Sequence, residues 1–216
     1  MKRLTILAYL ICFATVTYAQ QGVMPYDVLM RSGKIYLTDS KDYDKAEEFF
    51  STAVKNYPGQ PEAHYWLGTL YHDRSNFKEM ILQFRQFNEI YAKAKLSGDK
   101  KLIKTCEKDD MPKQIKDYSR SAFAKDFSDG VVQLKLADSL ARESLNLTDD
   151  TEKTQQKKYV NQLFDKANNL FAECLAIDDT VSGVYTNIGL VESKIGNSQG
   201  ALDMYRKAHQ LAPNDL

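Results

Sequence analysis

The sequence predicts an all-α fold, an α-solenoid made of stacked antiparallel helix hairpins. Two observations support this prediction. A set of glycine, alanine, aromatic and proline residues recurs at fixed offsets in three parts of the chain. No stretch shows the sustained alternation of apolar and polar residues that indicates a β-strand, so we predict no sheet. The expected helices span residues 24–38, 42–57, 61–74, 77–97, 112–146, 152–177, 182–195 and 198–211.

The recurring residues share a steric logic. A glycine in the first helix of a hairpin lets the second helix approach closely, alanines do the same from the second helix, and an aromatic ring fills the remaining gap. A proline then ends the second helix, because it cannot continue the hydrogen-bond ladder. The signature residues are Gly33, Ala46, Phe50, Ala53 and Pro58, then Gly68, Tyr71 and Phe84, then Ala167 and Phe171, and finally Gly189, Ala201, Tyr205, Ala208 and Pro213.

This set resembles the tetratricopeptide repeat, a helix–turn–helix unit of about 34 residues. The resemblance is most specific at residues 43–68 and 184–213. It implies a right-handed superhelix whose first helices line a concave groove that binds a peptide or protein. Two degenerate, elongated repeats with insertions are expected between Gly68 and Gly189, and the helix over 112–146 is expected either to run through Gly130 or to break there.

Four regions are expected along the chain. Residues 1–19 are typical of a secretory signal peptide, because Lys2 and Arg3 precede an uncharged apolar run and the small residue Ala19 precedes Gln20. The rest divides into N-terminal hairpins (20–97), an irregular lysine-rich connector (98–111) and C-terminal hairpins (112–216). The pattern resembles exported proteins of Gram-negative bacteria, so we expect a periplasmic or extracellular protein with no membrane span after cleavage.

Residue patterns for catalysis are sparse. The three histidines lack the spacing of a zinc site, and there is no nucleophile elbow, phosphate-binding loop or calcium loop. We therefore predict no enzymatic activity, no cofactor and no metal. Lys plus Arg (29) equals Asp plus Glu (29), and the cluster of eight lysines between Lys93 and Lys116 lacks interleaved arginines and aromatics. Nucleic-acid binding is therefore not expected.

Two cysteines remain after the predicted cleavage. Cys174 falls at a small-residue core position, which predicts a buried thiol, whereas Cys106 lies among lysines, which predicts a partly exposed one. A disulfide between them in an oxidising compartment is left open.

The concave groove supplies the candidate binding residues. Side chains three and four positions apart on the first helices share its face. Tyr65 is predicted to face the groove as a contact residue, and Trp66 either does the same or packs between repeats. The full predicted set is Lys34, Tyr65, Trp66, Thr69, His72, Thr186, Asn187 and Leu190.

We expect a non-catalytic scaffold or adaptor in the cell envelope that binds a protein or peptide in this groove. The alternative is a carrier of a small apolar ligand, because Met80 and Phe87 replace small residues and, with Phe77 and Phe84, could line a widened helix pair. The last hairpin has no polar capping helix after it, so its open face is expected to meet another subunit or a continuation of the chain.

Overall fold

The computed structural model describes residues 23–213, and the regular elements in this part of the chain are all helices, without a strand. The predicted signal peptide, residues 1–19, lies outside the described residues. The α-helices are α2 (Tyr26–Ile35), α3 (Tyr43–Asn56), α4 (Pro61–Asp73), α5 (Phe77–Ser97), α6 (Lys100–Glu107), α7 (Met111–Glu143), α8 (Asp150–Ile177), α9 (Ser182–Lys194) and α10 (Ser198–Leu211). Short turns of other helix types, η1 (Tyr36–Ser40), η2 (Lys108–Asp110) and η3 (Ser144–Asn146), join some of them.

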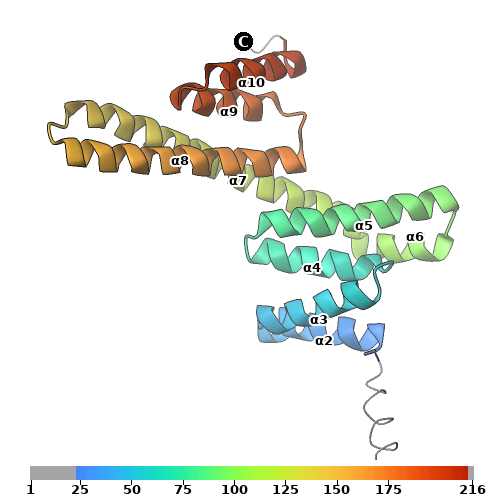
Figure 1. Ribbon diagram of the computed structural model, residues 1–216. Helices are drawn as coiled ribbons and strands as arrows, with labels where there is room; N and C mark the ends of the chain where they lie inside the picture. Colours follow the sequence, from blue (N-terminus) through green and yellow to red (C-terminus); the bar gives the residue numbers. More distant parts are fainter. Residues whose placement is uncertain (1–22, 214–216) are drawn as a thin grey trace, which may run out of the picture.

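The helices form four antiparallel hairpins, α2–α3, α4–α5, α7–α8 and α9–α10, which stack into an α-solenoid (Figure 1). The all-α prediction is confirmed, and of the α-helices in the described residues only α6 has no predicted counterpart. Helices α3 and α10 end at Asn56 and Leu211, two residues before Pro58 and Pro213, as the proline signature predicts.

One glycine in each hairpin permits a close approach of its two helices. A Cβ atom at Gly189 would lie 2.7 Å from a ring carbon of Tyr205, closer than atoms can pack. The same arrangement occurs in the other three hairpins, in the pairs Gly33–Phe50, Gly68–Phe84 and Gly130–Phe171. Ala46, Ala167 and Ala201 are buried on the second helices.

Helix α7 is continuous through Gly130, so the break considered at this position does not occur. Gly130 is the site of close approach to Phe171, which is why a glycine stands in the middle of the helix. The α7–α8 hairpin is therefore a single elongated repeat, in place of the two degenerate repeats expected between Gly68 and Gly189. Its two helices extend well beyond the neighbouring hairpins, and α7 also runs back towards α4 and α5 (Figure 1).

The prediction of an irregular connector over 98–111 is wrong for most of its length, because Lys100–Glu107 forms α6. The side chain of Asp99 accepts a hydrogen bond from the amide of Leu102 at 3.0 Å and so caps the helix. The buried Cys106 anchors the helix in the core. Positive φ angles of 53° and 57° at Asp109 and Asp110 then turn the chain into α7.

Three clusters of buried side chains form the core. The first joins α2, α3 and α4, the second joins α4, α5, α6 and α7, and the third joins α7, α8 and α9. Cys106 belongs to the second and Cys174 to the third, and both are buried free thiols. The predicted partial exposure of Cys106 is therefore wrong, because one face of α6 packs into the core. Burial raises the pKa of Cys106 to about 11 and that of Cys174 to about 12.

The second cluster also fills the helix pair in which an apolar ligand was considered. Phe77, Met80, Phe84 and Phe87 are all buried and pack in one cluster with Tyr65. Side chains of the protein occupy the space that the carrier hypothesis requires. The larger residues at 80 and 87 are accommodated because α6 and the start of α7 pack against them.

Candidate binding surfaces

The first helices of the four hairpins are α2, α4, α7 and α9. The residues predicted to line the groove lie on three of them, α2, α4 and α9. Lys34 lies on α2, the residues from Tyr65 to His72 lie on α4, and those from Thr186 to Leu190 lie on α9. The structure separates them into three environments. They do not form one continuous open groove.

The predicted contact surface on α4 is covered by the chain itself. Tyr65 is 3% exposed, and its hydroxyl donates a hydrogen bond to Oε1 of Gln114 on α7 at 2.5 Å. Thr69 is also buried, and its hydroxyl donates to the carbonyl of Tyr65 at 3.0 Å. The ring of His72 packs against that of Tyr118, with centroids 4.6 Å apart.

The prediction that Tyr65 faces an open groove is therefore wrong. Helix α6 reverses the chain direction, and the first turns of α7 then lie against α4, where a partner was expected. No repeat signature marks this segment, so the spacing of the repeats carried no sign of it. The signal that was available is negative: residues 92–111 fit no repeat, which indicates inserted structure between hairpins.

Lys34 and Trp66 lie at the junction of the first two hairpins. Lys34 Nζ is 2.5 Å from Glu62 Oε1 and 5.0 Å from the centroid of the Trp66 ring. Lys108 Nζ approaches the same carboxylate oxygen at 3.8 Å. The Trp66 ring also stacks near Phe50 of the first hairpin, with centroids 6.4 Å apart. Of the two alternatives for Trp66, packing between repeats is the one observed.

The predicted residues on α9 remain accessible. Gly68 and Gly189 occupy equivalent positions, so Leu190 is the counterpart of the buried Thr69 and Thr186 that of Tyr65. Leu190 is 40% exposed, whereas Thr186 and Asn187 are half-buried. Both polar side chains donate hydrogen bonds to carbonyls one turn earlier, Thr186 to Ser182 and Asn187 to Gly183. Their remaining surface and Leu190 form an accessible stripe, which we call the α9 face.

An ion-pair network lies beside the α9 face. Asp138 of α7 pairs with Lys194 of α9 and with Arg142 one turn further along α7. The hydrogen bond from Lys194 lowers the pKa of Asp138. The Asp138–Lys194 pair links α7 to α9, whereas the Asp138–Arg142 pair lies within α7.

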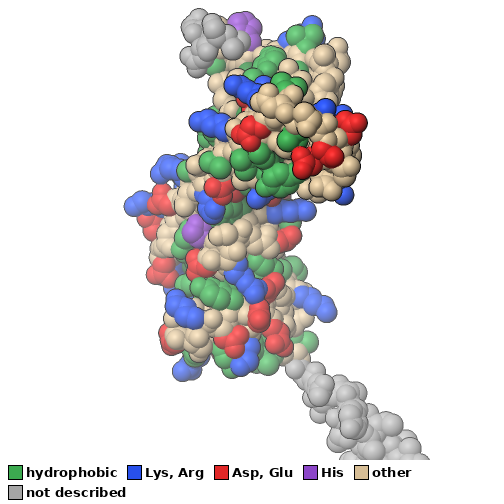
Figure 2. Space-filling model, turned by 90° about the vertical axis from the view of Figure 1, so that its left-hand side faces the viewer, with side chains coloured by type: hydrophobic (Ala, Val, Ile, Leu, Met, Phe, Trp, Pro, Cys, Tyr) green, Lys and Arg blue, Asp and Glu red, His purple; other side chains and the backbone are tan. Residues whose placement is uncertain are grey.

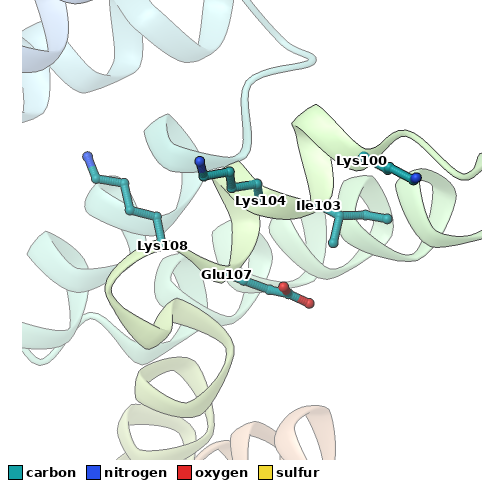
Figure 3. Close-up of a pocket in the computed structure, with 5 residues that line it drawn as sticks. All are labelled: Lys100, Ile103, Lys104, Glu107 and Lys108. Carbon is teal, nitrogen blue, oxygen red and sulfur yellow. The ribbon is translucent and has the colours of Figure 1, made fainter.

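The lysine-rich segment forms a shallow hollow on α6. Its volume is about 430 Å³, and its lining residues are Lys100, Ile103, Lys104, Glu107 and Lys108. Lys104 and Lys108 point to one side, whereas Lys100 points away from them (Figure 3). Glu107 accepts a hydrogen bond from the hydroxyl of Tyr91 at 2.6 Å. The charges do not converge on one point, so the hollow is not organised to hold a single anion.

Charges of both signs are also intermixed over the wider surface. Figure 2 shows basic and acidic side chains alternating on one face of the molecule, with hydrophobic side chains between them. This distribution agrees with the equal numbers of basic and acidic residues in the sequence. Attraction of a partner therefore depends on local pairs rather than on a field of one sign.

The structure contains one buried carboxyl group that sequence reasoning missed. Asp126 of α7 is 3% exposed, and its Oδ2 atom has no hydrogen-bond partner among the described residues. Burial, with a smaller contribution from the nearby Glu173 of α8, raises the pKa of Asp126 to about 7. A signal was present: Asp126 lies four residues from both Ala122 and Gly130, so it falls on the buried stripe of α7.

The histidines and carboxylates of residues 23–213 do not gather into a metal site. Within this range, no group of three or more His, Cys, Asp or Glu side chains is placed to hold a metal ion. His64 is buried and its Nδ1 atom lies 2.8 Å from Oε1 of Gln83, which gives it a structural partner. None of the helices in the same range combines the length and apolar character needed to cross a membrane.

Two segments of the chain match models of the tetratricopeptide repeat, residues 27–59 and residues 182–215. The first covers α2–α3 and the second covers α9–α10. No curated protein matches the sequence.

Solved structures of repeat proteins are similar to the chain at low sequence identity. YrrB, described as a tetratricopeptide-repeat protein with an unusual peptide-binding site, is 16% identical, with 94% of this chain and 93% of that chain covered and a TM-score of 0.29. MamA is 19% identical, with 88% and 96% covered and a TM-score of 0.29. A thermophilic repeat protein from Thermus thermophilus is 20% identical, with 88% and 93% covered and a TM-score of 0.27.

Proposed function

Because the chain is a tetratricopeptide-repeat protein, we propose that it is a non-catalytic scaffold or adaptor that binds another protein in the cell envelope. The repeats support the general role, since stacked helix hairpins present extended surfaces to partners. The envelope setting rests on the sequence of residues 1–19, with its basic start, apolar run and small residue before Gln20.

The observation that carries the proposal is the contrast between α4 and α9. The repeat positions that were predicted to face the groove are covered by α7 where they lie on α4. The equivalent positions on α9 are accessible. Leu190 offers an apolar contact, and Thr186 and Asn187 flank it with polar groups. A small apolar centre with polar surroundings is the usual composition of a protein-binding surface. The α9 face therefore takes the role first predicted for Tyr65 and its neighbours.

Capture of a partner from the envelope fraction of the native organism tests this proposal. The purified protein is immobilised, and bound proteins are identified by mass spectrometry. Replacing Leu190 by Glu places a charge in the proposed contact and should reduce recovery of the specific partner at least about tenfold. The matched control is Leu202→Glu on α10, since Leu202 is 43% exposed and Leu190 is 40% exposed.

Equal recovery with wild type and Leu190→Glu would exclude the α9 face as the binding surface. An equal loss with Leu202→Glu would show that added charge acts non-specifically. The same samples test the setting, because a protein processed on export should begin at Gln20. A native chain that begins at Met1 and stays in the cytoplasmic fraction would contradict the envelope part of the proposal.

A further inference from the structure

A groove runs between α5 and α8, the second helices of their hairpins, and it is separate from the α9 face. Two hollows of about 410 Å³ and 540 Å³ share Ile81 and Arg85 of α5 and Ala176 of α8 in their linings, so they form one continuous groove. We call it the α5–α8 groove. None of its lining residues belongs to the predicted binding set.

The walls of the groove follow from side-chain spacing. On α5, Lys78, Ile81 and Arg85 are three to four residues apart and therefore lie along one face of the helix. On α8, Ala172 and Ala176 are four residues apart, and both are exposed. Two small side chains on one wall leave space that larger ones would fill. The result is an apolar floor between two helices.

Basic groups without an acidic partner mark the α5 wall. Lys78 and Arg85 are seven residues apart, about two helical turns, and neither forms an ion pair within the described part of the chain. Arg74 differs from them, because it pairs with Asp44 and Glu47. Glu89, one turn beyond Arg85, also lines the groove but forms no ion pair with either cation, so Lys78 and Arg85 remain available to an acidic partner.

The α8 wall has the opposite character. Glu173 lines this side of the groove, and the buried Asp126 lies behind it. A partner helix with acidic groups on both flanks would place some of them beside Glu173, where the like charges repel. A partner helix that is acidic where it meets Lys78 and Arg85, and neutral or basic beside Glu89 and Glu173, matches both walls.

We propose that the α5–α8 groove docks an amphipathic helix of a partner protein, with its apolar stripe on Ile81, Ala172 and Ala176 and acidic residues along one flank against Lys78 and Arg85. A helix fits because both walls are helices with internally paired backbones, so they offer no free edge for an extended peptide to join. The lining from Lys78 to Ala92 extends over about 21 Å, the length of a four-turn helix.

A designed peptide is the probe for this proposal. It is a fluorescent helix of about four turns, with leucines at helical spacing, glutamates along one flank and glutamines along the other. Its binding to the full-length protein is followed by fluorescence anisotropy. Arg85→Glu should weaken binding about tenfold or more, as expected for loss of a charged contact and its replacement by repulsion. A peptide with lysines in place of the glutamates should bind the wild type weakly and the Lys78→Glu/Arg85→Glu variant more tightly.

A steric variant tests the floor of the groove. Ala176→Leu fills the shared part of the two hollows and should also weaken the glutamate peptide about tenfold. The matched controls are Arg31→Glu on α2, which reverses an exposed arginine far from the groove lining, and Ala124→Leu on α7, and both should leave binding unchanged. Circular dichroism and thermal melting verify that every variant is folded.

Several results would overturn the proposal. Failure of the glutamate peptide to bind folded wild-type protein is one, and binding that is indifferent to both Arg85→Glu and Ala176→Leu is another. Sedimentation showing a dimer that Arg85→Glu dissociates would identify a second copy of the chain as the occupant instead. Leu190→Glu should not affect the peptide, so this result and that of the α9 face are independent.

Discussion

At the scale of single residues, the repeat depends on glycines, which have no side chain, at the points where two helices cross. Gly189 lies under the ring of Tyr205, and an equivalent glycine lies under an aromatic ring in each of the other hairpins. Because the ring occupies the space of a missing side chain, glycine and aromatic residue must both be present for the helices to approach. The paired glycine and aromatic residue are therefore retained in each hairpin even where the rest of the repeat has diverged.

Asp126 is an acidic residue that lies buried in the protein. Its raised pKa means that the folded protein binds a proton that the unfolded chain releases at much lower pH. Its contribution to stability is therefore fully present at acidic pH and is lost as the pH rises towards 7. Glu173 from α8 and Lys125 and Asp129 from α7 are the charged groups that act on it.

We predict that Asp126→Asn removes this pH dependence. Between about pH 4 and pH 7 a single such group changes the free energy of unfolding by up to about 1.4 kcal/mol per pH unit. The variant should melt at a higher temperature than wild type at pH 8, and the difference should shrink or reverse at pH 5. Thermal melts at several pH values measure this. Parallel curves for the two proteins would show that Asp126 has an ordinary pKa.

At the scale of elements, the short helix α6 changes the role of its neighbours. It occupies the interval between the second and third hairpins, and the reversal at Asp109 and Asp110 brings α7 against α4. Tyr65 and Gln114 then become partners within the core. An insertion of eight helical residues thus converts a potential binding surface into an internal interface.

We predict that substitutions at Tyr65 affect stability rather than partner binding. Tyr65→Phe removes one hydrogen bond and should cost about 1 kcal/mol, whereas Tyr65→Ala leaves a cavity and should cost about 3–5 kcal/mol. Denaturant unfolding measures both values. The Phe variant should capture partners as the wild type does. A folded Phe variant that loses partner binding would return Tyr65 to the binding surface.

At the scale of the whole molecule, α7 connects the two halves of the solenoid. Its first turns belong to the core cluster that contains α4 and α5, and its later turns pair with α8. Because this continuous helix of 33 residues contributes side chains to both clusters, unfolding of α7 removes packing contacts from both of them. The two halves should therefore unfold together.

We predict that Ser128→Pro uncouples them. Ser128 lies in the middle of α7 and is not buried, and proline there breaks the helix at a cost of about 3 kcal/mol or more. Calorimetry should resolve two transitions in place of one, while Ser128→Ala retains a single transition. Two transitions in the wild type, or one unchanged transition in the proline variant, would show that α7 does not couple the halves.

The helix positions apart from α6, the pairing of helices into hairpins and three of the four glycine–aromatic crossings followed from the amino-acid sequence, whereas Gly130 was not recognised as the fourth crossing glycine. These features are local or repeat at short range: helical periodicity, prolines after the second helices, and glycines opposite aromatic rings. The prediction for Gly189 and Tyr205 was therefore confirmed, and the boundaries of α4 and α5 were found almost to the residue.

Which faces remain open depended on contacts between residues far apart in the chain. Thr69 and Leu190 occupy the same place in their repeats, yet Thr69 is buried and Leu190 is accessible. Nothing within either repeat distinguishes the two faces, because the segment that covers α4 lies 49 residues beyond Tyr65. Periodicity describes how a helix packs against its nearest neighbours, whereas the path of α7 decides which of those helices can still meet a partner.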